Sequence, residues 1–210
     1  MIGLYAIVEG ARAAGRGARG EELRIVRCGG LELVVGEAPA PLSEDSLRAH
    51  EATVRAIADA SSACLPARFG AGASDEAELV RLLAADEPAL QRALELVRGR
   101  EQMTLRLQGV ATASAASEAR TGTRYLEERR RAQSVPELDP LRDALRDLIR
   151  AEQVERHPGG KGLLASVYHL IDRGAAAEYT RRVEQIPLGE LSATVTGPWP
   201  AWAFAPGIAP

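Results

Sequence analysis

Apolar residues follow a period of two in the first segments of the chain, which is the period of a β-strand. Residues 2–8, 22–28 and 31–37 are apolar or alternating runs, and each predicts a strand. Gly29 and Gly30 separate the last two runs and supply the positive φ angles of a tight turn. The pattern therefore predicts one strand followed by a β-hairpin.

A helical spacing replaces this alternation from residue 43 onward. Residues 43–61 carry one apolar stripe with charged residues on the opposite side. The stripe consists of Leu47, His50, Val54 and Ile57. The remaining elements predicted in this half are a short strand at 63–70, a helical stretch from Ser74 that Pro88 divides and Asp86 caps, and an alternating strand at 102–108.

The second half also mixes helices and strands. The small, uncharged run at 109–117 has no hydrophobic stripe and indicates a domain boundary. The elements predicted beyond it are a charged helix at 122–133, a helix from Asp139 with Leu141, Leu145, Leu148 and Ile149 on its apolar face, a central strand at 162–171, a helix at 176–186 and a strand at 191–196. The predicted fold class is α+β, with two small α/β sandwich domains at 1–110 and 111–196 and an extended tail at 197–210.

The tail is rich in aromatic residues and has no charge. It contains both tryptophans and one of the two phenylalanines, and no side chain from 191 to 210 is charged. Its prolines break any helix, so it is not a membrane span. We expect Trp199 and Phe204 to pack against the body as a structural clasp, with Trp202 more exposed; the alternative is a tail kept free for a partner. This motif comprises Gly197, Pro198, Trp199, Pro200, Trp202 and Phe204.

Composition narrows the possible partners. A formal net charge of −3 over 210 residues gives no general attraction to nucleic acid. Cys28 and Cys64 are far apart and match no metal-ligand spacing, which favours reduced thiols in a cytoplasmic protein. The first ten residues lack the basic start of a signal peptide. These features predict a soluble cytoplasmic protein.

No combination of residues predicts catalysis. The three histidines have no ligand spacing, and His50 and His169 lie in apolar patterns that favour packed core histidines. Residues 157–164 are not a phosphate-binding loop, because Gly162 follows Lys161 where that loop has Ser or Thr. We therefore expect no catalytic, metal or cofactor-binding site and no cofactor, with an enzyme of unrecognised site as a remaining alternative.

A second structural motif lies in the segment ACLPARFG at 63–70, where we assign Pro66, Arg68, Phe69 and Gly70. Phe69 is expected in the core, and Pro66 marks an edge or irregular strand because it has no N–H donor. Arg68 stands just before a helix that opens with acidic residues. We expect its guanidinium to pair with Asp75 or Glu76.

Several stretches, taken in order, resemble the GvpF/GvpL family of gas vesicle proteins. They are GLYAIV at 3–8, HEATVRAIADASSACLPARFG at 50–70, REQMTLRL at 100–107, GTRYLEERR at 122–130 and TGPWPAWAF at 196–204. LPARFG and GPWPAWAF are the specific ones. The chain departs from the family at Ala201, Trp202 and Ala203, which replace a proline, a tyrosine and a serine, and in the AGAS sequence after Gly70.

The resemblance implies a non-enzymatic accessory protein of gas vesicle formation, found in the cytoplasm and at the vesicle. It implies binding to the hydrophobic shell protein GvpA and to other accessory proteins. It also implies a ferredoxin-like N-terminal domain, although glycine-rich residues 10–20 occupy the place of that fold's first helix. The alternative is a ferredoxin-like module that binds a small molecule or nucleic acid. Against it, Tyr5 is the only aromatic residue in the strands before the first helix.

Overall fold

The computed structural model describes residues 1–11, 15–38, 41–109, 138–157 and 162–207. The chain forms two compact units. The first unit comprises Met1–Gln102 together with Trp199–Pro210, and the second unit comprises Met103–Pro198. Both ends of the chain therefore belong to the first unit, and the second unit is inserted between them.

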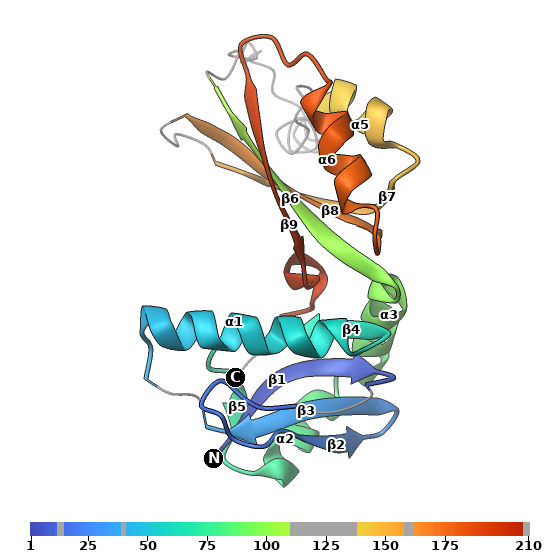
Figure 1. Cartoon of the computed structure of the whole chain (residues 1–210). Helices are drawn as coiled ribbons and strands as arrows, with labels where there is room; N and C mark the ends of the chain where they lie inside the picture. Colours follow the sequence, from blue (N-terminus) through green and yellow to red (C-terminus); the bar gives the residue numbers. More distant parts are fainter. Residues whose placement is uncertain (12–14, 39–40, 110–137, 158–161, 208–210) are drawn as a thin grey trace, which may run out of the picture. The chain divides into compact units, whose positions relative to one another are not determined.

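The first unit contains an antiparallel sheet (Figure 1). Its strands are β1 (Ile2–Glu9), β2 (Arg24–Cys28), β3 (Leu31–Glu37) and β4 (Ala63–Pro66), in the spatial order β2-β3-β1-β4, and the short β5 (Gly72–Ala73) also pairs with β1. The predicted hairpin is confirmed, because Cys28 pairs with Leu31 across the turn. Of the two turn glycines, only Gly29 has a positive φ, at +56°.

Helix α1 (Glu44–Asp59) covers one face of this sheet (Figure 1). Its N-terminus is capped by Ser43, whose side chain accepts the N–H of Ser46. The predicted apolar stripe is confirmed at three of its four positions, whereas Leu47 is 44% exposed. The core on this face contains Tyr5, Ala6, Val8, Leu23, Val34, Val54, Ile57, Ala58 and Cys64.

Helices α2 (Glu76–Ala84) and α3 (Glu87–Val97) contact β2 and β4, respectively. The predicted break at Pro88 is confirmed, since this proline stands in the first turn of α3, where its missing N–H has no helical partner. The prediction that Asp86 caps α3 is confirmed only for its position, since Asp86 is the N-cap residue but its side chain makes no capping hydrogen bond. Asp75 caps α2 by accepting the N–H of Glu78.

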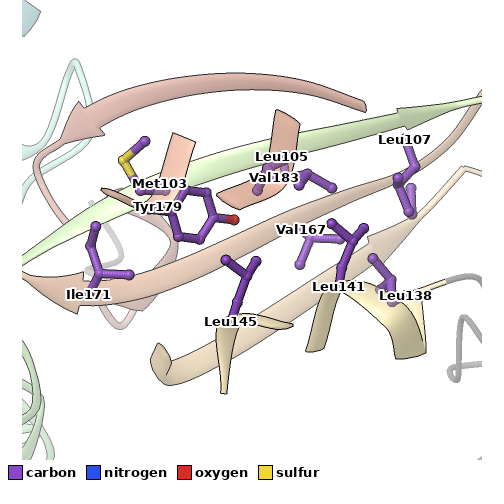
Figure 2. Packing of buried hydrophobic residues seen from close by; sticks show 11 residues of the cluster. Met103, Leu105, Leu107, Leu138, Leu141, Leu145, Val167, Ile171, Tyr179 and Val183 are labelled. Carbon is purple, nitrogen blue, oxygen red and sulfur yellow. The ribbon is translucent and has the colours of Figure 1, made fainter. Parts of the chain in front are cut away.

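In the second unit, two described helices pack on a four-stranded sheet. The strands are β6 (Arg100–Gln108), β7 (Ile149–Arg156), β8 (Leu163–Asp172) and β9 (Ser192–Trp199), in the order β7-β8-β6-β9, and the helices are α5 (Asp139–Leu145) and α6 (Ala176–Glu184). Figure 2 shows Leu141 and Leu145 of α5 and Tyr179 of α6 directed toward Val167 of β8. The predicted central position of β8 is confirmed, because it has a neighbour on each side.

The sequence pattern does not predict strand β7. It places Leu148 and Ile149 on a helix, whereas α5 ends at Leu145 and Ile149 begins the strand. Buried and exposed residues do not alternate clearly along β7, because its residues are either half-buried or exposed. The register of β7 with β8 also shifts between Ile149 and Ala151. The apolar period is therefore a poor indicator of this element.

The divisions of the chain also differ from the expected domain bounds. The sequence predicts boundaries after residues 110 and 196, whereas the compact units divide after Gln102 and Pro198. The reason is that β6 pairs in the second sheet. The predicted helix at 122–133 and most of the expected boundary at 109–117 lie outside the described residues. No helix in the described ranges is long and apolar enough to cross a membrane.

Replacing Gly72 with alanine is expected to destabilise the first unit. An added Cβ would lie 2.2 Å from the backbone oxygen of Ile2, and backbone atoms cannot move aside as a side chain can. Overpacking of this kind costs about 1–3 kcal/mol. Denaturant unfolding of Gly72→Ala should show this loss. The matched control is Gly207→Ala, whose Cβ would meet nothing within 4 Å. Equal stability of the two variants would contradict the predicted clash.

Candidate functional site

The two predicted motifs meet at one histidine in the first unit. The His50 ring stacks on Tyr5 with centroids 5.1 Å apart, and it forms a T-shaped contact with Phe69 with centroids 5.6 Å apart. The Trp202 ring lies 6.3 Å from it at a tilt of 44°. We call Tyr5, His50, Ala67 and Phe69 the tail-docking site.

The segment after β4 is fixed by backbone hydrogen bonds to β1. Ala67 donates its N–H to the Tyr5 carbonyl at 2.9 Å, and Leu4 donates to the Ala71 carbonyl at 2.9 Å. Between these bonds Gly70 has a φ of +91°, a conformation that L side chains rarely adopt. Pro66 is buried in β4, which is the edge strand predicted from it. This segment therefore holds Phe69, which is half-buried, in place against His50.

The C-terminal segment returns to the first unit after β9. Gly197 has a φ of +127°, and the chain then enters a short 3-10 turn at Trp202–Phe204. Phe204 is only 6% exposed, and the N–H of Ala203 donates to Oε1 of Gln102 at 2.8 Å. The segment is thus extended only as far as Pro200.

The two tryptophans occupy different surroundings, and both are half-buried. The guanidinium of Arg55 lies 4.7 Å from the ring centroid of Trp199, in cation–π geometry. Trp202 packs against the core beneath α1, which includes Tyr5, Val54 and Cys64. The ring that the sequence predicts to be the more exposed therefore has apolar contacts of its own.

His50 is a buried core histidine, as the sequence predicts, with 7% of its surface exposed. Its Nε2 lies 3.0 Å from the Ala67 carbonyl, which can only accept, so Nε2 carries the proton. Burial lowers the pKa of His50 below its usual value of 6.5, and the bond to Ala67 opposes this only in part. The ring is therefore neutral at pH 7.

Tyr5 connects the docking site to the loop before β2. Its hydroxyl donates to Oε1 of Glu21 at 2.7 Å and accepts the N–H of Ala18 at 3.0 Å. Burial raises the pKa of Tyr5 to about 12, so the phenol stays neutral. Tyr5, His50 and Phe69 also line a small pocket of about 50 Å³.

Arg68 does not form the predicted ion pair in the described part of the chain. Its side chain is exposed. Both expected carboxylates have other partners, since Asp75 caps α2 and Glu76 pairs with Arg24 at 2.5 Å. The prediction of a fixed pair with either carboxylate was therefore wrong.

The second unit contains a buried polar chain that resembles a catalytic triad. Glu152 accepts from both Arg142, at 2.7 Å, and His169 Nε2, at 3.0 Å. His169 Nδ1 lies 2.7 Å from the Tyr179 hydroxyl. The bonds from His169 and Arg142 lower the pKa of Glu152 to about 2, whereas burial raises the pKa of Tyr179.

The His169–Tyr179 end of this polar network is closed to a substrate. His169 and Tyr179 are both 0% exposed, and burial keeps the phenol protonated and non-nucleophilic. His169 is thus a satisfied core histidine, as predicted. The apolar periodicity of the sequence does not indicate a role for Glu152, because its strand is polar and the pattern does not show that buried His169 is its partner. The described ranges also contain no His, Cys, Asp or Glu group that could hold a metal ion.

A groove lies between α6 and β9 in the second unit, and Thr180 and Glu184 line it together with several apolar residues. Its volume is about 300 Å³. The apolar lining residues are Val183, Ile186, Leu188, Leu191, Ala193 and Val195. Since β9 ends the described strand order of its sheet, the groove borders the outer strand of that order. The sequence predicts both elements but gives no indication that their apolar faces leave this space.

These observations define a two-unit α+β protein whose described residues form two packed cores, a tail-docking site and a groove beside β9. Residues 2–206 match the family described as gas vesicle synthesis protein GvpL/GvpF. The chain belongs to this family. Comparison with curated proteins found no match.

Two crystal structures share the fold. One is the gas vesicle protein GvpF from Anabaena sp. PCC7120, with a TM-score of 0.73 and 16% identity over 98% of this chain and 95% of that one. The other is the gas vesicle protein GvpF from Microcystis aeruginosa, with a TM-score of 0.73 and 14% identity over 98% of each chain. The fold is therefore preserved although the sequences have diverged widely.

Replacing Tyr179 with phenylalanine should destabilise the protein by about 1–3 kcal/mol, because buried His169 Nδ1 loses its partner. The matched control is Tyr168→Phe, since the Tyr168 hydroxyl bonds Glu155 in an exposed position at 3.1 Å. Urea unfolding measures both variants. If the two phenylalanine variants lose the same small amount of stability, the buried chain does not contribute as described.

Proposed function

We propose that this protein is a non-enzymatic accessory factor of gas vesicle formation that binds the hydrophobic shell protein GvpA and other vesicle proteins during nucleation or assembly. The observation that carries the proposal is the family match, which extends over residues 2–206. Its expected location is the cytoplasm and the gas vesicle. The first unit is proposed to be ferredoxin-like on its strand order β2-β3-β1-β4, although the described residues between β1 and β2 contain no helix in the place of that fold's first one.

The α6/β9 groove is the surface that we propose for GvpA. A shell subunit that assembles through apolar surfaces needs a partner with an apolar surface of its own. The groove provides Leu188, Leu191 and Val195, and it borders β9, which ends the described strand order of its sheet and beside which a partner strand could be added. A helix of the partner could bury apolar side chains in the groove, and a strand of the partner could pair with β9.

The C-terminal segment is proposed to act as a structural clasp and not as the partner-binding element. Buried Phe204, Trp202 against the core, and the Gln102–Ala203 hydrogen bond all support a segment that docks on its own chain. Fully burying one such ring contributes about 1.5–3 kcal/mol. These contacts leave the segment little exposed apolar surface to offer a partner.

The competing function is a small-molecule or nucleic-acid binding module. Nucleic-acid-binding sheets of this kind stack bases on exposed aromatic rings. Tyr5 is 5% exposed and its ring is stacked on His50, so it offers no such platform. This argues against nucleic-acid binding, which a filter-binding assay with RNA tests.

In a pull-down, the purified protein should retain GvpA, and a filter-binding assay should show no retention of RNA. Ala193→Glu places a charge in the groove and should reduce GvpA retention at least about tenfold, the equivalent of about 1.4 kcal/mol. Thr194→Glu, at the exposed neighbouring position, should retain GvpA normally. Melting temperatures of both variants separate lost binding from unfolding. Retention of RNA without GvpA would overturn the proposal, and equal binding by both variants would exclude the groove.

Truncation after Thr196 should lower the melting temperature of the isolated protein, because Phe204 and Trp202 leave the core. The same cut should leave GvpA retention unchanged at a temperature where the truncated protein is folded. Differential scanning calorimetry and the pull-down provide the two measurements. An unchanged melting temperature with lost GvpA binding would show that the segment serves a partner instead.

A further inference from the structure

The tail-docking site contains a titratable group at its centre, and the segment docked there contains none. His50 is surrounded by three aromatic rings and the Ala67 carbonyl. The docked segment from Trp199 to Phe204 has no charged side chain. We propose that protonation of His50 releases the Trp202–Phe204 turn from the first unit, so that the docking site is a pH-sensitive latch. This inference rests on the proposed clasp but is independent of any partner.

The charged and titratable groups around His50 do not compensate a proton on its ring. Helix α1 contributes Ser46 to the adjoining pocket and Arg55 to the Trp199 ring, and β1 contributes the neutral phenol of Tyr5. Two carboxylates near the pocket are already engaged, because Glu21 accepts from Tyr5 and Glu37 pairs with Arg19 at 3.5 Å. Beyond β4, Arg68 is exposed and carries no negative charge that could stabilise a protonated ring. The tail itself offers only uncharged groups.

Release follows from the difference in hydration of the ring between the two states. With the turn docked, His50 is buried, and burial lowers its pKa. Undocking uncovers the ring and returns its pKa toward about 6.5. The undocked state therefore binds more protons as the pH falls below about 6.5, and docking weakens through that range. Each unit of difference in pKa weakens docking by about tenfold at low pH.

Tryptophan emission reports this equilibrium directly, because both tryptophans of the chain, Trp199 and Trp202, lie in the docked segment. The full-length protein should show blue-shifted emission at about pH 7.5 and a red shift between about pH 6.5 and 5. The far-UV circular dichroism should stay constant over the same range. His50→Gln keeps an N–H donor for Ala67 but cannot be protonated, so its emission should not change with pH.

The matched control is His157→Gln, because His157 bonds Ser166 at 2.9 Å in the second unit and should not influence the latch. This variant should follow the wild type. The latch is overturned if wild-type emission stays blue-shifted down to about pH 5, or if His50→Gln shows the same red shift. Red-shifted emission already at about pH 7.5 would instead contradict the clasp itself.

A second measurement keeps the test decisive if His50→Gln does not fold. In the wild type, the ring-proton resonance of His50 and the indole N–H resonance of Trp202 should titrate with the same midpoint, because one protonation drives both changes. Midpoints that differ by more than about one pH unit would overturn the proposal.

Discussion

The hydrogen bond between Gln102 and Ala203 connects the two places where the chain crosses between its units. Gln102 is the last residue of the first unit before the insertion, and Ala203 follows the return. Gln102 is buried, so its amide oxygen would be costly to leave without a partner. The two residues are 101 positions apart, so closing this loop costs conformational entropy that the contacts of Phe204 and Trp202 must offset.

Buried polar groups fix the side chains around both cores. In the first unit His50 orients the rings of Tyr5 and Phe69 and also donates to Ala67. In the second unit His169 joins β7, β8 and α6 through Glu152 and Tyr179. Both histidines have the partners that their burial requires. Each unit thus combines an apolar core with a buried, hydrogen-bonded histidine that connects neighbouring segments of the unit.

Local periodicity predicts the elements that bury one face and expose the other, such as α1, α6 and the β2-β3 hairpin. It does not predict β7, because that strand is defined by pairing with β8, as in the non-local pair of Ile149 with Ile171. The candidate site was predictable only in part for the same reason. The motifs around Phe69 and Trp202 are unusual sequences, but their meeting at His50 depends on residues about 150 positions apart. The Arg68 prediction failed because proximity in sequence did not show that both carboxylates have other partners.

The insertion of the second unit has a consequence for synthesis on the ribosome. Chains emerge from the N-terminus, and domains generally fold as they are completed. Here the strands of the first unit emerge early, yet the segment that covers the core beneath α1 is translated only after the described strands of the second unit. A nascent chain therefore exposes the surface around His50 until this segment has been made. The order of translation makes docking of the segment a late step in folding of the first unit, although the first strands of that unit are made at the start.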